Sequence, residues 1–393
     1  MRYRYARVGG RSWLLTEPDT GAYGNATLNV AMSFVMARHL GARVCMHPAA
    51  SSRHEALWTL RCDGIHTVAP TPKSWSHLDQ VMRRASWLAG GSGRSRPGVR
   101  YLDSEDAGGA RTRWSRRYFG LDFRREYAER PLGVRFPSAL AERLPTLARA
   151  AGIDTRRPIV TLHVREGSYK ASLGIEDRPK DRVRNASIHD YVPAVDWLVA
   201  RGYQVVRFGD NLMEPFSRPG VVDLAVSPRR TAALEIWAVQ ASSFFVASDC
   251  GPFNLSILLG VPCLATNMTH LIGGYPLRKS DMYLPKHLHG TVDGRELPLE
   301  EMLAPGPFGH RFEGARFRFR DNTPEELLAA VQEMAVSTEE GPTWSPSQAA
   351  FRRLLIDWLA SDVGHKKATK GGLPPFHLGE GRVADVLAEH LLT

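Results

Sequence analysis

The hydrophobic pattern is most regular between residues 159 and 265, where short apolar runs alternate with segments of helical period. Runs rich in branched and aromatic residues predict buried strands. The predicted strands are Ile159–Val164, Tyr203–Phe208, Val221–Leu224, Ser243–Ala247 and Val261–Ala265, and the predicted helices are 187–201, 231–240 and 253–259. Strands that alternate with helices indicate a mostly parallel sheet with helices on both faces, which is a Rossmann-like domain.

A second, fainter α/β pattern opens the chain. A strand at Ser12–Leu15 is followed by a glycine-containing loop, a helix from about Thr27 to Leu40 and a strand at Ala42–Met46. This order predicts a βαβ unit. Residues 80–130 are rich in Arg, Gly and Ser, with Trp and Tyr interleaved, and give no clear elements.

These patterns divide the chain into three parts. We expect a Rossmann-like domain over residues 1–150, a second one over 151–335 and a helical extension over 336–393. Thr323-Pro-Glu-Glu326 marks a helix start near the end of the second domain, because Thr caps, Pro takes the first position and Glu closes the capping box.

Composition narrows the class of protein. Of 393 residues, 43% are hydrophobic and 23% charged, which excludes a disordered or fibrous chain. The formal net charge of +10 favours an anionic ligand, an anionic membrane surface or nucleic acid as partner. Cys45, Cys62, Cys250 and Cys263 lack metal-ligand spacing and are expected to be reduced. No export signal or membrane helix is evident in the sequence, so a cytoplasmic location is expected.

The sharpest chemical feature follows the strand at 243–247. The segment consists of Ser248, Asp249, Cys250, Gly251, Pro252, Phe253 and Asn254, and a short helix follows it. In a parallel sheet ligands bind at the carboxyl ends of the strands, and a helix start there presents N–H groups to an anion. Gly251 would let a phosphate approach the backbone, while Ser248 and Asn254 could donate hydrogen bonds. A tight strand-to-helix turn with no ligand is the alternative.

Two further strand ends carry polar groups at the same rim. His163, Arg165 and Glu166 end the strand that begins at Ile159. His163 and Arg165 face one side of the sheet, and Arg offers a fork for phosphate oxygens. Arg207, Gly209 and Asp210 end the next strand, where Arg207 could reach a phosphate and Gly209 shapes the turn. A core histidine and ordinary turn residues are the alternatives, and Glu166 is either a general base or the partner of Arg165 or Lys170.

In the N-terminal part, Glu17 and Asp19 precede the first helix. A carboxylate there could deprotonate an acceptor hydroxyl, or the acids could favour the helix dipole. The chain has no phosphate-binding GxxxxGK[ST] loop, no GxSxG nucleophile elbow and no acidic pair at a strand end that would hold a metal. We therefore expect a metal-independent mechanism without a resident cofactor.

At these residues the chain resembles known glycosyltransferases. Ser248-Asp-Cys-Gly-Pro-Phe-Asn-Leu-Ser256, with Leu259-Gly-Val-Pro262 after it, resembles the donor-site motif of bacterial ADP-heptose heptosyltransferases. His163-Val-Arg165 resembles the His-x-Arg signature of GDP-fucose fucosyltransferases. Residues 159–335 as a whole are similar to a family of bacterial glycosyltransferases. The resemblance implies a GT-B fold: α/β, with two Rossmann-like domains whose parallel sheets face each other across a cleft.

The resemblance also implies roles. Arg165 would contact the donor diphosphate, Gly251 and Pro252 would start the phosphate-binding helix, and His163 would border the pocket. Cys250 stands where heptosyltransferases usually have Thr or Ser, and Asn254 where they usually have His, so ADP-heptose specificity does not transfer. Glu166 replaces a basic residue that is common in fucosyltransferases. The C-terminal helices of many GT-B proteins pack back on the N-terminal domain.

The sequence therefore predicts an inverting glycosyltransferase that moves a sugar from a nucleotide diphosphate donor to a hydroxyl acceptor, a glycan or a small natural product. Glu17, Asp19 or Glu166 would be the base, and Arg165, Arg207 and the turn at Gly251 would stabilise the leaving diphosphate. A non-catalytic protein that binds a nucleotide or an anionic glycan and a nucleotide-sugar epimerase of GT-B fold are the alternatives. Nucleic acid binding through residues 80–130 is the weakest option, and peripheral contact with an anionic membrane agrees with the charge.

Overall fold

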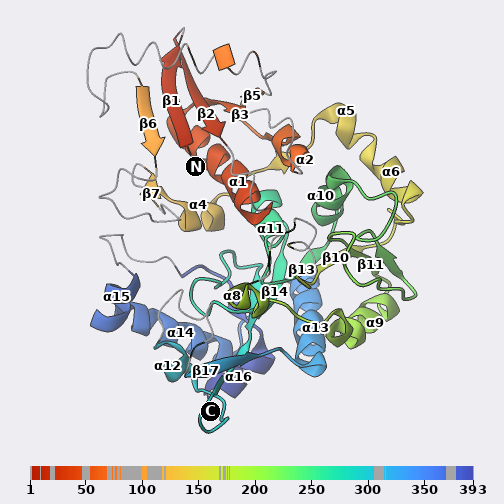
Figure 1. The fold of residues 1–393 in the computed structure, drawn as a ribbon, viewed down its shortest axis with the longest axis vertical. Coiled ribbons are helices and arrows are strands. Elements are labelled where there is room, and N and C mark those ends of the chain that lie inside the picture. Colours follow the sequence, from red (N-terminus) through yellow and green to blue (C-terminus); the bar gives the residue numbers. More distant parts are fainter. Residues whose placement is uncertain are drawn as a thin grey trace. The chain divides into compact units, whose positions relative to one another are not determined.

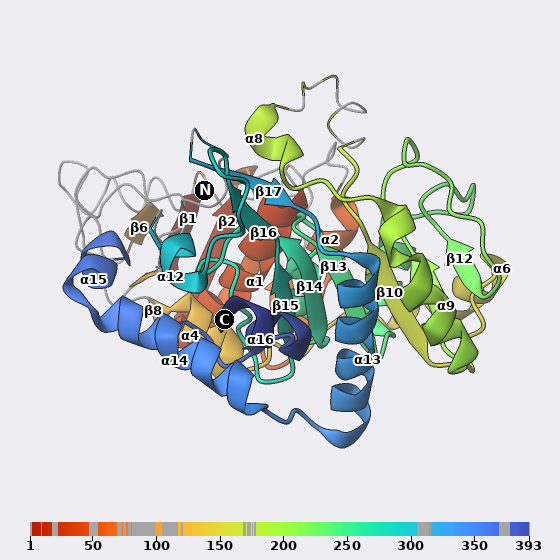
Figure 2. The same cartoon turned by 90° about the horizontal axis from the view of Figure 1, so that it is seen from below.

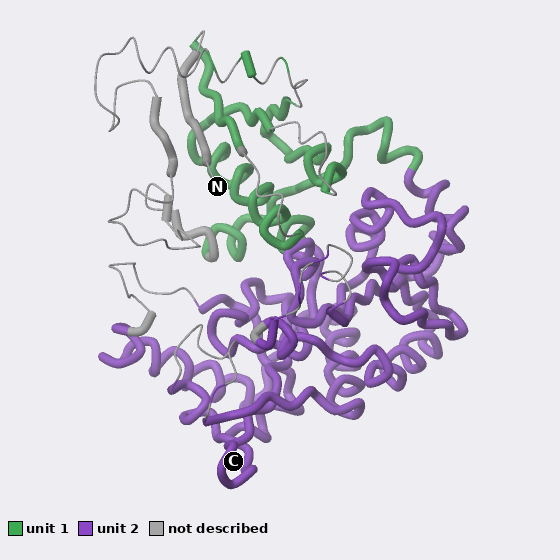
Figure 3. The backbone as a smooth tube through the Cα atoms, viewed as in Figure 1, with its two compact units in different colours: residues 1–143, 257–260 green, residues 144–256, 261–393 purple. Residues whose placement is uncertain are grey.

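The computed structural model describes residues 2–8, 10–17, 23–46, 54–68, 73, 76–77, 80, 99–103, 117–118, 121–167, 170, 174, 176, 178–304, 314, 316–368 and 378–392. The chain forms two compact units (Figure 3). The first unit comprises residues 1–143 with 257–260, and the second comprises residues 144–256 with 261–393. Figure 1 shows the elements of both units along the chain.

The first unit contains a five-stranded mixed sheet in the order β5-β3-β2-β1-β6. Its strands are β1 (Arg2–Val8), β2 (Arg11–Glu17), β3 (Arg43–Met46), β5 (Thr67–Val68) and β6 (Val99–Asp103). The predicted βαβ unit is confirmed, because β2 and β3 pair in parallel and helix α1 (Tyr23–Leu40) connects them. The sheet is parallel only over β2, β3 and β5, since β1 runs antiparallel to both β2 and β6.

The α1 helix supplies much of the first unit's core. Twelve of its residues are buried, from Gly24 to Ala37, so the helix is covered on most of its surface. Leu14 and Leu15 of β2 and Val44 of β3 are also buried. The remaining short elements are α2 (Glu55–Thr59), β4 (Arg61–Cys62), β7 (Arg117–Tyr118), β8 (Leu121–Asp122), α4 (Phe123–Glu129), β9 (Val134–Arg135) and α5 (Ser138–Ala141).

The second unit is built on a seven-stranded sheet in the order β12-β11-β10-β13-β14-β15-β18. The strands are β10 (Ile159–His163), β11 (Gln204–Arg207), β12 (Val221–Asp223), β13 (Phe244–Ser248), β14 (Cys263–Met268), β15 (Met282–Pro285) and β18 (Arg382–Val383). Every neighbouring pair is parallel. The predicted α/β class and its Rossmann-like parallel sheet are confirmed, and all five strands predicted for this unit are present as β10 to β14.

The strand order reverses direction between β10 and β13. From β10 the chain first builds outward through β11 and β12, and then returns to add β13 on the other side of β10. Helices α9 (Val192–Ala200) and α13 (Pro324–Glu340) pack together on one face of the sheet, and α10 (Ala232–Gln240) with α6 (Leu144–Ala150) covers the other (Figure 1). Such a reversal is the place where open parallel sheets bind ligands.

The C-terminal residues belong to the second unit and are not a separate extension. The predicted boundary at 335 falls inside α13, and β18 is the edge strand of the large sheet. Helices α14 (Pro346–Ala360) and α16 (Asp385–Leu392) pack together and supply buried Phe351, Leu355, Leu387 and Leu391 to this unit's core (Figure 2). Burial of these four side chains explains why the segment lies against the sheet.

The other short elements of the second unit lie between the strands. They are α8 (Pro179–Arg182), the 3₁₀ helix η1 (Ile188–Tyr191), α11 (Asn254–Leu259), β16 (His287–Gly290), α12 (Leu299–Met302), β17 (Phe317–Arg320) and α15 (Asp362–Ala368). Residues 257–259, the second half of α11, are counted with the first unit. The predicted capping box at the start of α13 is confirmed by Thr323 and Glu326. Within the described part of the chain, no helix combines the length and apolar character needed to span a membrane.

Candidate functional site

The strand ends on either side of the reversal carry the two segments singled out in the sequence. Strand β10 ends at His163 and β13 ends at Ser248, and the two strands are paired neighbours. Beyond the strand ends, the backbone N–H of Arg165 donates to Ser248 Oγ over 2.8 Å. Ser248 is fully buried, so its hydroxyl serves to join these two segments. We call the edge of the sheet where β10 ends at His163 and β13 ends at Ser248 the carboxyl edge.

The Arg165 side chain is held by the segment that contains α8. One of its guanidinium nitrogens donates to the carbonyl oxygen of Asp181 over 2.8 Å and to the side-chain oxygen of Asn185. The backbone of Ala186 closes the arrangement by donating to the Arg165 carbonyl oxygen over 3.0 Å. Arg165 is only partly buried, which means that these bonds orient a cation at the carboxyl edge without enclosing it.

Asp249 is bound on both of its oxygens. Arg184 Nε donates to Oδ1 over 2.9 Å, and the backbone N–H and hydroxyl of Thr269 donate to Oδ2. Burial by itself disfavours the charge on Arg184, but the Asp249 carboxylate outweighs it and the pKa of Arg184 is raised. Asp249 therefore anchors Arg184 and the end of β14 and has little freedom to contact a ligand.

Residues 250–254 form a turn that leads into α11. Burial raises the pKa of the Cys250 thiol to about 12, so the thiol is neutral, and its sulfur accepts a hydrogen bond from the Phe253 backbone. The carbonyl oxygens of Gly251 and Pro252 accept from the backbone N–H groups of Asn254 and Leu255 over 3.2 and 2.8 Å. The helix begins at Asn254, one residue later than predicted, and is six residues long.

Arg207 is buried in an ion-pair cluster, which corrects its predicted role as a phosphate ligand. Its side chain has 0% exposed area, and it pairs with Glu166 over 2.6 Å and with Asp223 over 2.9 Å. The second oxygen of Glu166 accepts from the Glu214 backbone over 3.0 Å. The partner of Glu166 is thus Arg207, and not Arg165 or Lys170 as considered from the sequence. Its two engaged oxygens argue against Glu166 as a general base.

His163 is a buried, neutral histidine. Its Nδ1 lies 2.9 Å from the carbonyl oxygen of Phe208, and because a carbonyl only accepts, Nδ1 carries the proton. Burial lowers the pKa of His163 to about 4, and the nearby Arg207 charge adds to the effect, against the opposing influence of the Phe208 hydrogen bond. The ring also packs on Phe208 with 5.2 Å between ring centroids.

Gly209 leaves room for the end of the Met213 side chain next to His163. A Cβ atom at this position would lie 2.2 Å from Met213 Sδ and 3.5 Å from His163 Cε1. The Gly209 backbone donates to Glu235, a buried acid whose pKa is raised by burial. Gly209 and Asp210 therefore shape the turn after β11, in agreement with the turn alternative.

The side chains of the two N-terminal carboxylates, Glu17 and Asp19, lie outside the described part of the structure. Glu17 is the last residue of β2, as an extension of the predicted strand, and only its backbone position is described. Asp19 lies outside the described residues. Their assignment as acceptor-side bases stays a prediction from the sequence.

Sequence reasoning missed a third basic side chain of this region, Lys286. It follows β15 directly, its side chain is 2% exposed, and it pairs with Asp321. Its Nζ also donates to the carbonyl oxygen of Asn185 over 2.8 Å, and Asn185 in turn binds Arg165. The position of Lys286 at a strand end could have identified it, because parallel strands bring their carboxyl ends to one edge.

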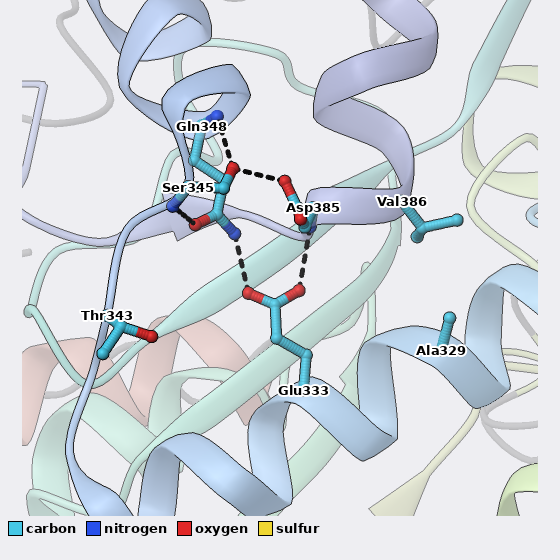
Figure 4. A pocket seen from close by; sticks show the side chains of 7 residues that line it. All are labelled: Ala329, Glu333, Thr343, Ser345, Gln348, Asp385 and Val386. Atoms are coloured by element: carbon cyan, nitrogen blue, oxygen red, sulfur yellow. Dashed lines mark hydrogen bonds between the residues drawn. The ribbon is translucent and has the colours of Figure 1, made fainter.

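A cavity elsewhere in the second unit offers little to a ligand. It has a volume of about 360 Å³ and is lined by Ala329, Glu333, Thr343, Ser345, Gln348, Asp385 and Val386 (Figure 4). Glu333 accepts from Gln348 Nε2 over 2.7 Å and from the Asp385 backbone over 2.8 Å, and Ser345 and Gln348 form the capping box of α14. Its polar groups are therefore used to cap helices.

Comparisons with known proteins give distant likenesses only. No family model matches the sequence, and no curated protein matches it significantly. Among solved structures the chain is similar to the glycosyl transferase family 9 protein from Veillonella parvula DSM 2008, at 14% identity and a TM-score of 0.37 over 64% of this chain and 78% of that chain. It is also similar to ADP-heptose LPS heptosyltransferase II of E. coli, at 13% identity and a TM-score of 0.37. This match covers 64% of this chain and 82% of the E. coli chain. Likeness at this level leaves the function to be inferred from the residues themselves.

Proposed function

We propose that the protein is a glycosyltransferase of GT-B type that binds a nucleotide diphosphate sugar at the carboxyl edge of the second unit. One observation carries the proposal. The two segments that resemble donor-site motifs, at His163–Arg165 and Ser248–Asn254, follow the two strands that flank the reversal of strand order. A ligand is expected at that point of an open parallel sheet.

The diphosphate would bind to the oriented cation at this edge. Arg165 is the group best placed for this role, because it is partly exposed and its guanidinium is held by Asp181 and Asn185. A guanidinium can bind two phosphate oxygens at once and can stabilise the charge that develops on the leaving diphosphate. Arg184 and Lys286 add positive charge nearby, although Asp249 and Asp321 partly neutralise it.

The reaction would be a direct displacement that inverts the sugar's anomeric centre. The acceptor hydroxyl attacks the anomeric carbon, the bond to the diphosphate breaks, and a carboxylate takes the hydroxyl proton. Because Glu166 is bound to Arg207, Glu17 and Asp19 are the carboxylates that we propose for the base. The nucleotide sugar is a co-substrate, and no resident cofactor or metal is required by this scheme.

Binding can be tested by thermal unfolding of the full chain with a panel of nucleoside diphosphates and nucleotide sugars in EDTA. We expect selective stabilisation by one nucleoside class, since a ligand at 100 times its Kd adds about 2.7 kcal/mol. Arg165→Ala should abolish the shift. Arg182→Ala is the matched control, because this exposed arginine lies in α8, within the segment that holds the Arg165 side chain, and its loss should leave the shift intact. Equal loss in both variants, or no shift with any nucleotide, contradicts the proposed donor site.

Sugar transfer is tested separately with Glu17→Gln and Asp19→Asn. Loss of transfer with unchanged donor binding in one of them would support that residue as the base. Transfer that survives in both variants would contradict the assignment. Donor binding without transfer to any acceptor would favour the alternative, a protein that binds a nucleotide without catalysis.

A further inference from the structure

A cluster of two histidines and one glutamate forms in the second unit from residues far apart in the sequence. His287 is the first residue of β16, Glu296 lies in the segment before α12, and His390 is in the last turn of α16. Their sequence spacing has no metal-ligand pattern, which is why the sequence did not predict the cluster. The fold brings them together, since the His287 and His390 rings lie 5.8 Å apart between centroids.

The ligand atoms of the three residues are already close. His287 Nδ1 lies 2.6 Å from Glu296 Oε1, and His390 Nε2 lies 2.9 Å from Glu296 Oε2. One ligand atom from each residue falls within 4.8 Å of the others. Both histidines thus direct a ring nitrogen at the same carboxylate, which is the donor convergence that a small cation needs.

A second carboxylate, that of Glu326, contacts the ring of His287 on the side away from Glu296. The other ring nitrogen, Nε2, lies 2.9 Å from Glu326 Oε2. Glu326 is itself fixed, because the Thr323 backbone donates to it over 2.8 Å in the capping box of α13. Metal-binding histidines usually donate their second N–H to such a carboxylate, which sets the tautomer and orients the ring. His287 therefore has the supporting contact expected of a ligand as well as the ligand atom.

We propose that His287 Nδ1, a Glu296 oxygen and His390 Nε2 form a divalent metal site suited to Zn²⁺. Two imidazole nitrogens and one carboxylate are a ligand set typical of zinc, whereas Mg²⁺ and Ca²⁺ prefer oxygen ligands throughout. His287 Nδ1 and His390 Nε2 now hold protons in their hydrogen bonds to Glu296. These two protons would leave to solvent as the metal–nitrogen bonds form. A fourth position would be filled by water.

The site would fasten the C-terminal helix to the β16 strand. The His287 side chain is 9% exposed and the His390 side chain 51% exposed, so an ion reaches the site from the side of α16. Binding to the folded chain alone would stabilise the second unit. The site uses none of the residues of the proposed donor site, and it does not depend on sugar transfer.

The test is a Zn²⁺ titration by calorimetry of the full chain after removal of metal with EDTA. We expect one equivalent to bind, and His390→Ala to weaken binding at least a hundredfold. His189→Ala is the matched control, because His189 Nε2 also lies 3.0 Å from a glutamate, Glu214, and is similarly exposed. This control should bind like the wild type. Equal weakening in both variants, or no binding by the wild type, overturns the proposal.

Two further measurements guard against a merely structural effect. Glu326→Gln keeps the capping box, which accepts Gln, and leaves all three ligands in place, so a loss of about 10- to 100-fold in affinity is expected. Co²⁺ should give the visible spectrum of a tetrahedral site with nitrogen and oxygen ligands. Bands of cobalt–thiolate bonds would instead place the metal on the cysteines, all four of which are buried, and would overturn the site.

The cluster without metal would be an ion-pair network. Burial alone would lower the pKa of His287, but the hydrogen bonds that its ring donates to Glu326 and Glu296 raise it to about 9. A protein that binds no Zn²⁺ in the titration has this network only.

Discussion

Arg207 is fully buried, and its energetics depend on two carboxylates. Removal of one partner from a buried ion pair leaves charge without compensation, which costs about 3–5 kcal/mol. We expect Arg207→Met to lower the free energy of unfolding by about that amount, because Glu166 and Asp223 would then repel each other in a poorly solvated site. Urea denaturation at neutral pH measures the change.

The matched control for Arg207 is Arg218→Met. Arg218 also binds a carboxylate, Asp196, over 2.6 Å, but its side chain is 32% exposed. Exposed pairs contribute about 0–1 kcal/mol. If the two variants lose the same stability, burial does not determine the strength of the Arg207 cluster.

His163 should make stability depend on pH. Its pKa is about 4 in the folded chain, lowered chiefly by burial, against about 6.5 in the unfolded chain. The unfolded state thus binds the proton first, so the stability that this group contributes is present above pH 6.5 and is lost as the pH falls toward 4. The loss amounts to about 3 kcal/mol over that window. Urea denaturation at several pH values measures it.

His163→Asn isolates this contribution, because its amide can still donate to the Phe208 carbonyl oxygen but does not titrate. We expect the variant to lose about 3 kcal/mol less than the wild type between pH 6.5 and 4. Comparison of the two pH dependences removes any packing cost that is the same at every pH. Parallel curves would show that His163 is not the buried neutral group described above.

The location of the candidate site could be predicted from single residues, but their partners could not. The strand ends at His163 and Ser248 follow from the hydrophobic pattern, and the parallel sheet brings them to one edge. Arg207, however, pairs with Glu166, 41 residues away, and with Asp223, 16 residues away. Nothing in the local sequence separates the partly exposed Arg165 from the enclosed Arg207, because both lie at or just beyond the end of a strand.

At the scale of elements, strong hydrophobic runs were predictable and short or polar strands were not. Strand β1 has the sequence RYRYARV, and its three arginines leave no continuous apolar run that would predict a strand. This strand makes the first sheet mixed, since both of its pairings are antiparallel. Strand β18 has two residues, one of them Arg382, which is 1% exposed and pairs with Glu333. Only tertiary packing reveals such a strand.

The helix that follows β18 gives an element-scale prediction. In α16, Leu387 is 1% exposed and packs in the core of the second unit, whereas the adjacent Val386 is 37% exposed. Leu387→Ala should lower the free energy of unfolding by about 2–5 kcal/mol through lost burial and a cavity. Val386→Ala should change it by no more than about 0.5 kcal/mol. Equal effects in chemical denaturation would mean that the C-terminal residues form a loose extension after all.

At the scale of the whole molecule, the two units have different sheets. The core cluster around Val160, Phe244 and Leu387 consists of residues of the second unit only. Chains with two such units commonly depart from two-state unfolding. We therefore expect two transitions in calorimetry, of which Leu387→Ala should lower only one and thereby assign it to the second unit.

The proposed donor site predicts which transition responds to ligand. Arg165, Ser248 and Lys286 all belong to the second unit, so the nucleoside diphosphate selected in the binding screen should raise the transition that Leu387→Ala lowers. At 100 times its Kd the ligand should add about 2.7 kcal/mol to that transition. Arg165→Ala should remove the increase without moving the other transition. A nucleotide that raises only the transition untouched by Leu387→Ala would place the binding site in the first unit and contradict the assignment of the carboxyl edge.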